Sequence, residues 1–498
     1  MYKKLILVIA FYAVALFSGY ASAAEKPNIL FIFADDQMYK SLGTNNKDIK
    51  TPNLDSLAAR GVSFTHAYNP GSYSPAVCMA SRMMLNSGAF LWQAAKYPSR
   101  NKIAANSTNS NSAYWSQYIK DAGYETYMSG KWHVPVSAKA LFDHSTHIRA
   151  GMPKQTPIRY RRKFIEGEAD TWSPYDKSKG GFWQGGKHWS KVLADDGQNF
   201  LEQTKNSDKP FFMYLAFNAP HDPRQAPKKF VDMYPVKNIT VPENFLTSYP
   251  YNEHAGAPET LRDERLAPHP RTKFAVQTNL QEYYASISHL DEQVGRILKA
   301  LEATGKEENT YIIFTADHGL AVGDHGFMGK QNMYDRSIRV PLFIVGPGLA
   351  HGKQVTAPVY LQDVMPTSIE LAGAKVPENV AFHSLLPLAT GKTDSSAYPA
   401  IYGAYTHLQR MYRTEKYKLI IYPNANVVRL YDMANDPFEM HDLAEAKNKP
   451  VKLMGQLFSE FLELQKAIDD PLDVSQVLAN FLNGVPALPL SKGNAKHE

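Results

Sequence analysis

Residues 27–36, with the sequence PNILFIFADD, decide the fold class. The apolar run at 29–34 does not alternate with polar residues, which is typical of a strand buried on both faces of a parallel sheet. Two adjacent carboxylates, Asp35 and Asp36, follow this run directly. Three further runs of the same kind are predicted as strands, at residues 125–128, 211–217 and 311–315.

Helical segments separate these predicted strands. Thr51 and Pro52 favour the start of a helix that Gly61 ends, and residues 283–300 carry apolar side chains at helical spacing. Strands that alternate with helices imply an open α/β sheet with crossover connections. We therefore expect an α/β fold with a large, mixed but mostly parallel sheet flanked by helices.

A polar cluster follows each of the four predicted strands. In chain order the clusters are Asp35 with Asp36, Lys131 with His133, His221, and Asp317 with His318. Open α/β sheets bind ligands outside the carboxyl ends of their strands, so the four clusters should meet in one crevice. A single cluster of this kind is often only a solvated strand end, whereas four together favour a functional site.

The sequence pattern changes after about residue 395. Short alternating runs predict a small antiparallel sheet, at residues 401–405, 409–413, 417–422 and 428–431. A helix follows, with Leu453, Leu457, Phe458, Phe461 and Leu462 on one face. We assign residues 25–395 to a large N-terminal domain and residues 396–498 to a smaller α+β subdomain.

The first 24 residues have the anatomy of a secretory signal peptide. Lys3 and Lys4 precede an apolar run at 5–17, and the small residues at 21–23 form a cleavage site. This run is shorter than the ~20 apolar residues of a membrane-spanning helix. We expect cleavage near Ala23, a periplasmic or secreted product and no stable membrane association.

The composition excludes several classes of protein. The 498 residues hold 54 Lys and Arg against 48 Asp and Glu, a net charge of +6. No run of five like charges occurs, so we expect no nucleic-acid partner. The single cysteine, Cys78, excludes a disulfide scaffold, and the apolar fraction of 44% excludes a disordered chain.

Asp35, Asp36 and Asp317 offer three hard oxygen ligands at one edge of the predicted sheet. Grouped carboxylates repel one another unless a cation lies among them, and oxygen-rich sites suit Ca²⁺ or Mg²⁺. His318 adds a possible nitrogen ligand. An Asp-Asp pair by itself is also common in turns and helix caps, so the pair alone does not establish a metal site.

Cys78 lies in the segment 73–82, YSPAVCMASR. Pro75 and the helix-compatible stretch 79–86, which Gly88 ends, predict that Cys78 lies at a helix N-terminus, where backbone N–H groups favour an anionic ligand. Arg82 is four residues further on and shares a face with Cys78. A lone cysteine is also often a small buried apolar residue.

Residues 78–82, CMASR, match the signature C-x-[PA]-S-R. This signature belongs to the formylglycine-dependent (type I) sulfatases of the alkaline phosphatase superfamily, and the chain resembles that family from Lys26 to about Pro471. The supporting motifs, in order, are PNILFIFADD at 27–36, TPNLD at 51–55, GKWH at 130–133, APH at 219–221, TADHG at 315–319, GDHG at 323–326, RVP at 339–341 and LYD at 430–432. The resemblance implies an alkaline-phosphatase-like fold, with residues 25–395 as the catalytic domain, and hydrolysis of sulfuric esters.

The resemblance also implies a modified nucleophile and a metal site. A formylglycine-generating maturation enzyme would oxidise Cys78 to Cα-formylglycine, whose hydrate carries the nucleophilic hydroxyl. The implied ligands of one Ca²⁺ ion are Asp35, Asp36, Cys78, Asp317 and His318. The implied catalytic residues are Cys78, Arg82, Lys131, His133, His221, Asp317 and Lys330.

Each implied catalytic residue has a distinct expected role. Asp317 would deprotonate the hydrate, which Arg82 would orient. Lys131, His221 and Lys330 would bind the sulfate oxygens. His221 together with Lys330 would also stabilise or protonate the departing sugar oxygen. His133 would take a proton from the second hydroxyl, so that the aldehyde re-forms and sulfate is expelled.

The segment between His133 and Phe211 is rich in aromatic and basic residues. The resemblance to marine bacterial carbohydrate sulfatases favours an algal polysaccharide, of the carrageenan or ulvan type, as substrate. We hypothesise that this segment forms subsites for such a chain, although ordinary loop packing explains each residue equally well. The candidate residues are Arg149, Lys154, the group at 159–163, Trp172, Trp183, His188 and Trp189.

Three other functions remain open at this point. The first is a phosphate or phosphonate monoester hydrolase of the same superfamily. The second is a non-catalytic binder of sulfated glycans, which would require an unmodified Cys78. The third, a hydrolase with a cysteine thiolate nucleophile, is disfavoured because the neighbouring carboxylates would oppose a thiolate.

Overall fold

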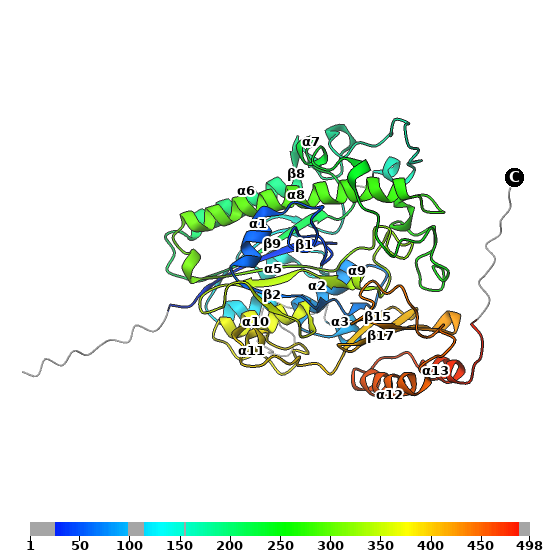
Figure 1. The fold of residues 1–498 in the computed structure, drawn as a ribbon. Helices are drawn as coiled ribbons and strands as arrows, with labels where there is room; N and C mark the ends of the chain where they lie inside the picture. The colour runs from blue at the N-terminus through cyan, green and yellow to red at the C-terminus, as the bar shows by residue number, and fades with distance from the viewer. Residues whose placement is uncertain (1–24, 98–113, 154–155, 488–498) are drawn as a thin grey trace, which may run out of the picture.

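Figure 1 shows the fold in a computed structural model that describes residues 25–97, 114–153 and 156–487. The predicted signal peptide and Lys154 lie outside the described residues. Within the described ranges, every helix is too short or too polar to traverse a lipid bilayer.

The central element is an eight-stranded sheet with the order β13-β2-β12-β10-β1-β9-β5-β6. Strands β1, β5, β6, β9 and β10 pair in parallel, whereas β12 is antiparallel to β10 and β2. The mixed, mostly parallel sheet predicted from the sequence is therefore confirmed. Its strands are β1 (Asn28–Asp35), β2 (Val62–Phe64), β5 (Glu125–Lys131), β6 (His144–Arg149), β9 (Phe211–Pro220), β10 (Thr310–Ala316), β12 (Leu342–Val345) and β13 (Lys353–Val355).

The four strands predicted from the sequence are neighbours at the centre of this sheet, in the order β10-β1-β9-β5. All residues of β1 and β9 are buried, as the unbroken apolar runs indicate. Because the four strands are parallel, their carboxyl ends lie at the same edge of the sheet. The polar clusters that follow them are thereby brought together.

Helices cover both faces of the sheet (Figure 1). One layer contains α1 (Pro52–Ala59), α6 (Trp189–Thr204) and α8 (Lys273–Ala303), and α6 and α8 pack on β9. The opposite layer contains α2 (Val77–Ser87), α4 (Trp115–Asp121) and α10 (Val364–Leu371), which pack on one another. The shorter described helices are α3 (Leu91–Ala95), α5 (Ala138–Leu141), α7 (Lys228–Val231), α9 (Asp335–Ile338) and α11 (Leu386–Thr390).

Helix α8 begins at Lys273, well before the predicted start at residue 283. The Thr272 hydroxyl accepts a hydrogen bond from the Ala275 N–H and caps the helix. Polar side chains interrupt the apolar pattern of its first turns, and they bond to other segments: Gln277 to the Ile239 carbonyl and Gln281 to the Tyr234 carbonyl. Tertiary contacts therefore place polar residues on a helical face that the sequence pattern left unassigned.

A second sheet, mostly antiparallel, lies near the C-terminus with the order β18-β17-β16-β15-β4. It contains β15 (Ile401–Tyr405), β16 (Gln409–Arg413), β17 (Tyr417–Tyr422), β18 (Val427–Asp432) and β4 (Gly71–Ser72). The predicted α+β region is confirmed, and helices α12 (Val451–Ala467) and α13 (Ser475–Leu482) follow it. β4 pairs in parallel with β15, so the chain just before Cys78 extends the C-terminal sheet. The predicted division at residues 395 and 396 stays a prediction.

Two small sheets complete the described fold. β3 (Ala67–Tyr68) lies between β11 (Arg339–Val340) and β14 (Val359–Tyr360). β7 (Trp183–Gln184) and β8 (Lys187–His188) form a short hairpin just before α6.

Candidate active site

Polar side chains from the four central strands and from helix α2 meet at the carboxyl edge of the sheet. Asp35 is the last residue of β1, and Lys131 is the last residue of β5. His221 comes directly after β9, and Asp317 comes directly after β10. The structure thus brings the predicted clusters together, as expected for the ligand-binding edge of an open α/β sheet.

Cys78 is the second residue of α2 and is 4% exposed. No side chain caps this helix at Ala76, so its first backbone N–H groups are not satisfied by a capping residue. At the other end Gly88 adopts a left-handed conformation, with φ of 69°, and its N–H bonds to the Met84 carbonyl. The local sequence therefore places Cys78 at a helix N-terminus, as predicted.

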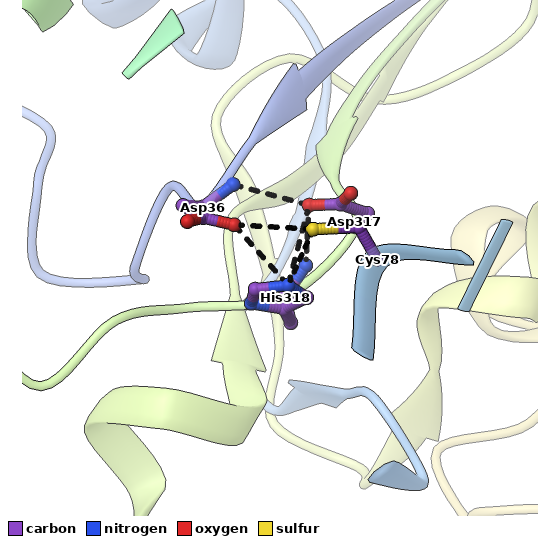
Figure 2. A group of neighbouring side chains, drawn as sticks. All are labelled: Asp36, Cys78, Asp317 and His318. Carbon is purple, nitrogen blue, oxygen red and sulfur yellow. Dashed lines mark hydrogen bonds and ion pairs between the residues drawn. The ribbon is translucent and has the colours of Figure 1, made fainter. Parts of the chain in front are cut away.

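Two carboxylates and an imidazole surround the sulfur of Cys78 (Figure 2). The Cys78 Sγ lies 3.7 Å from Asp36 Oδ1 and 3.4 Å from His318 Nε2. Asp317 Oδ1 accepts hydrogen bonds from the backbone N–H groups of Asp36, at 3.1 Å, and of His318, at 3.0 Å. One ligand atom from each of the four residues lies within 4.8 Å of the others.

Three buried cationic side chains face these carboxylates. Lys330 donates to both oxygens of Asp36, at 2.7 and 2.8 Å, and its Nζ lies 3.1 Å from the Cys78 Sγ. Lys131 donates to Asp35. Arg82 Nε donates to Asp317 Oδ2 at 3.0 Å, and its guanidinium also donates to the Lys131 carbonyl at 2.8 Å. The centre therefore contains cations that can bind an anionic substrate group.

The charges of the centre shift the pKa values of its acids. Burial opposes ionisation of Cys78, but the positive charges of Lys131 and Lys330 outweigh it and lower the pKa of the thiol well below its usual range. Burial also disfavours charged Asp317, but Arg82 is among the cations that lower its pKa to about 2. Asp35 differs, because burial and the neighbouring Asp317 raise its pKa well above the usual range.

The two predicted catalytic histidines have opposite protonation preferences. Burial disfavours a charged His221, but Asp36, 3.6 Å from its Nε2, and Asp222 raise the pKa of the ring to about 10. Burial lowers the pKa of His133 instead. The Nδ1 atom of His133 is buried, and no described residue forms a hydrogen bond with it. At neutral pH His221 can therefore donate a proton, and His133 can accept one.

The donor set fits a hard divalent cation. Asp35, Asp36 and Asp317 are at most 1% exposed. Asp35 Oδ1 is buried, and no described residue forms a hydrogen bond with it. The Arg82 guanidinium lies 3.8 Å from this oxygen, beyond hydrogen-bond distance. A buried carboxylate oxygen without a hydrogen bond is costly, and a cation among these three carboxylates would reduce that cost. The protein therefore offers the ligands expected of a Ca²⁺ or Mg²⁺ site.

Sequence reasoning missed the residues that hold the ligands in place. The Tyr283 hydroxyl donates to the Asp36 carbonyl at 2.6 Å, and the side chains of Asn69 and Ser81 both donate to the Asp317 carbonyl at 2.7 Å. Asp222 Oδ1 lies 3.0 Å from His221 Nδ1 and orients that ring. Ser81 belongs to the CMASR signature, whereas no pattern in the sequence pointed to Asn69 or Tyr283.

The structure corrects part of the proposed polysaccharide subsites. Arg159, Trp172 and His188 are at most 3% exposed and cannot present open faces to a sugar. Arg159 pairs with Glu282 at 2.9 Å, and the His188 ring accepts the Ser190 N–H as the cap of α6. These side chains stabilise the fold because the long segment folds back onto α8. Trp183 is also largely buried, at 9% exposed, whereas Trp189 is half-buried and the Arg149 guanidinium stacks 3.7 Å from its ring centroid.

Fold and site together define an enzyme of the α/β class, whose centre combines a cation-binding carboxylate cluster with side chains that bind an anion. The family model described as "Sulfatase" matches residues 27–374, and the model described as "N-sulphoglucosamine sulphohydrolase, C-terminal" matches residues 323–467. The chain belongs to the sulfatase family and is a sulfuric ester hydrolase.

Curated relatives extend over most of the chain. A protein named "Sulfatase" from Formosa agariphila is 30% identical over 453 residues, which cover 85% of this chain and 84% of the relative. An "Ulvan-active sulfatase" from the same organism is 28% identical, with 90% of this chain and 80% of the relative covered.

Solved structures share the fold at lower identity. One is a complex with its substrate D-glucosamine-2-N,6-O-disulfate; it is 24% identical, has a TM-score of 0.68, and covers 90% of this chain and 99% of that chain. The phosphonate monoester hydrolase of Agrobacterium radiobacter is 21% identical, with a TM-score of 0.67. The match covers 89% of this chain and 96% of that chain. The fold alone therefore does not separate sulfate from phosphonate chemistry.

Proposed function

We propose that this enzyme removes sulfate from a sulfated polysaccharide or oligosaccharide, with Cα-formylglycine at position 78 and one calcium ion. One observation carries this proposal: three buried carboxylates and three buried cations enclose the side chain of Cys78. A purely structural role for Cys78 does not require this concentration of buried charge.

Asp35, Asp36, Asp317 and His318 would hold the calcium ion together with the modified side chain at position 78. When bound, the ion supplies positive charge that offsets the three carboxylates and polarises an oxygen of the sulfate group. His318 is prepared for this role because its Nδ1 donates to the Gly319 carbonyl at 2.7 Å, which directs Nε2 toward Asp36.

A formylglycine hydrate supplies a nucleophilic hydroxyl and a second hydroxyl that allows sulfate to be eliminated without a second attack by water. Asp317 would accept the proton of the attacking hydroxyl at a carboxylate oxygen. Arg82 fixes Asp317 through its bond to Oδ2, and the low pKa of Asp317 keeps it ionised for this step. His133, which is neutral, would take the proton of the second hydroxyl.

Lys131, Lys330 and His221 would bind the sulfate group. In the structure Lys330 contacts both Asp36 and the Cys78 Sγ, whose place an oxygen of the hydrate would take, so its Nζ is within reach of a group bound at position 78. Charge grows on the departing sugar oxygen during cleavage, and the protonated His221 is placed to neutralise it.

An algal polysaccharide of the ulvan or carrageenan type is the substrate class that we propose. The 28% identity to an ulvan-active sulfatase over 90% of this chain supports this assignment. Export to the periplasm or the medium, with cleavage near Ala23, would bring the enzyme to such a substrate. Oxidation of Cys78 by a formylglycine-generating enzyme would be part of the same route.

Two measurements test the proposal. Turnover of 4-nitrophenyl sulfate should greatly exceed that of 4-nitrophenyl phosphate; the reverse order would indicate the phosphate or phosphonate hydrolase instead. Mass spectrometry of the tryptic peptide 61–82 should show the aldehyde at position 78. An unmodified thiol in fully active protein would disprove the formylglycine mechanism. Sulfate release from a panel of sulfated algal oligosaccharides would then identify the sugar.

A further inference from the structure

A second pocket lies on the outer helical layer of the molecule, and lysines stand among its lining residues. It has a volume of about 360 Å³ and is bordered by the β7–β8 hairpin and the helices α6, α7 and α8. We call it the Trp183 pocket, after the residue on its wall; its lining includes Tyr175, Lys177, Trp183, Lys187, Lys191 and Lys228.

The Trp183 pocket is separate from the Cys78 centre. Helix α8 packs on β9 and on α7, and Figure 1 shows α7 and β8 beyond α8 as seen from the central strands. Tyr283 of α8 contacts Asp36, whereas His289, six residues later, lines the pocket. Six residues correspond to ~9 Å along a helix and about 120° around it. The two sites therefore lie on different sides of α8.

The charge of the pocket favours an anion. Four lysines line it, and none of its lining residues is acidic. Two of the lysines have carboxylate neighbours: Lys187 Nζ is 3.6 Å from Asp195, and Lys228 Nζ is 2.7 Å from Asp232. Within the described ranges, no carboxylate pairs with Lys177 or Lys191. All four lysines are exposed, so their ammonium groups are accessible to a ligand.

Aromatic rings form part of the pocket wall. Tyr175 is 40% exposed, and Lys228 Nζ lies 5.7 Å from its ring centroid. The Trp183 indole N–H donates to the Pro174 carbonyl at 3.3 Å, so its polar group is already satisfied. Lys177 Nζ lies 5.5 Å from the Trp183 ring. Apolar ring surface beside cationic groups suits a ligand that has both a carbon face and negative charge.

A buried polar atom in the pocket lining lacks a partner. His289 is 3% exposed, and no described residue forms a hydrogen bond with its Nδ1. Burial and the neighbouring His188 keep the pKa of this ring well below its usual range, so the ring is neutral. Buried polar atoms are normally hydrogen-bonded, so the wall of the pocket at His289 contains a polar atom that the described residues leave unsatisfied.

We propose that the Trp183 pocket binds an anionic saccharide unit, sulfated or uronic, at a site distinct from the catalytic centre. The lysines would pair with sulfate or carboxylate groups, and the exposed ring of Tyr175 would pack against the sugar face. Binding here would hold a polysaccharide on the enzyme and raise the local concentration of its ester groups at the centre. The choice of a saccharide rests on the proposed function, but binding itself requires no modification of Cys78.

The test measures binding without catalysis. Dextran sulfate, unsulfated dextran and alginate serve as probes in isothermal titration calorimetry at low salt, in a Cys78→Ala background. We expect dextran sulfate or alginate to bind and unsulfated dextran not to bind. The quadruple variant Lys177→Gln, Lys187→Gln, Lys191→Gln, Lys228→Gln should bind about tenfold more weakly. Tyr175→Ala should weaken polysaccharide binding without weakening that of inorganic sulfate.

A matched control separates this pocket from general surface charge. Lys375→Gln, Lys416→Gln, Lys449→Gln, Lys452→Gln removes four other exposed lysines and the same amount of charge. This control should retain the affinity of the parent protein. An equal loss of polysaccharide affinity in both quadruple variants, or no loss of affinity in the pocket variant, would overturn the proposal. Equally tight binding of a single-stranded oligonucleotide would overturn the assignment to a saccharide. Because no turnover is measured, these outcomes are distinct from failure of the proposed hydrolysis.

Discussion

Two buried groups of charged side chains, the Cys78 centre and a cluster around Lys418, differ in how closely their carboxylates are crowded. At the Cys78 centre, burial and the neighbouring Asp317 raise the pKa of Asp35 well above its usual range. In the Lys418 cluster, Lys418 Nζ lies 2.7 Å from Asp335 Oδ1 and 2.6 Å from Glu439 Oε1. The Asp335 N–H also donates to Glu439 Oε2 at 2.9 Å.

The difference shows what each group does for the protein. The Lys418 cluster connects β17 to α9 and supplies a cation to each carboxylate from the chain itself. The Cys78 centre also pairs its carboxylates with cations of the chain, but it crowds three carboxylates around one thiol, where an added cation would offset their mutual repulsion. Carboxylates that are spaced apart and paired with cations of the chain stabilise a fold, whereas carboxylates crowded against one another are retained at sites that bind or transform a ligand.

The largest expected effect is on catalysis. Cys78→Ala should lower turnover of 4-nitrophenyl sulfate by at least about 10⁴-fold, because it removes the proposed nucleophile. The neighbouring Met79→Ala is the matched control and should keep most of the activity. Initial rates at saturating substrate give the comparison. A Cys78→Ala enzyme that kept a tenth of the wild-type rate would show that position 78 does not supply the nucleophile.

The Lys418 cluster should govern stability rather than chemistry. Lys418→Met removes the buried cation that lies within 2.7 Å of both Asp335 and Glu439 and should lower the free energy of unfolding by about 3 kcal/mol. Lys416→Met, two residues away and exposed, should change it by less than about 0.5 kcal/mol. Urea denaturation followed by circular dichroism measures both. Equal stability of the two variants would refute the structural role of the cluster.

Calcium should stabilise the protein through the Cys78 centre and not through the Lys418 cluster. At a concentration of about 100 times its dissociation constant, the ion should add about 2.7 kcal/mol to the free energy of unfolding of the wild type. Asp36→Asn should lose most of this gain, because it removes a proposed ligand. Thermal unfolding with excess calcium or with a chelator measures the difference. Identical midpoints for the wild type under both conditions would argue against a calcium site.

The smallest expected effect is a pH dependence of stability. Burial opposes ionisation of Asp335, but Lys418 and Arg413 outweigh it and hold the pKa of this carboxyl well below its usual range. The unfolded chain binds this proton near pH ~3.9 and the folded chain only at lower pH. The stabilisation is therefore complete above pH ~4 and is lost as the pH falls below it, by up to about 1.4 kcal/mol per pH unit.

Asp335→Asn should lack this acid-side contribution. Its free energy of unfolding should fall less steeply than that of the wild type between pH ~4 and pH ~3. Asp394→Asn, at an exposed position, is the matched control and should follow the wild-type curve. Parallel curves for Asp335→Asn and the wild type would contradict the assigned shift.

The predicted site residues could be found because they follow strands with a strong local signal. Asp35 and Asp317 each come at the end of an unbroken apolar run, and parallel strands place such ends at one edge. Asn69 and Tyr283 could not be found in this way. They bond to backbone carbonyls of the centre from segments more than 240 residues away in the chain, and no local pattern encodes such a contact.

In the segment between His133 and Phe211, sequence reasoning assigned residues to a substrate site where the structure shows packing residues. Its aromatic and basic composition indicated sugar subsites, yet Arg159 and Trp172 are buried in contacts with the rest of the fold. Composition alone cannot distinguish an exposed ring from a buried one, since burial depends on which helix the segment packs against. Trp183 and its surrounding lysines line a pocket of about 360 Å³.

The sequence by itself determined the four central strands of the large sheet, the position of Cys78 at the start of a helix and the order of the sulfatase motifs. These features are local, because the pattern of neighbouring residues determines strand burial, helix caps and motif spacing. Only the tertiary structure decided which side chains meet. Lys330 reaches Asp36 across 294 positions of the chain, and β4 joins a sheet whose other strands lie more than 300 residues later. Such contacts are set by the packing of distant elements, which no local pattern specifies.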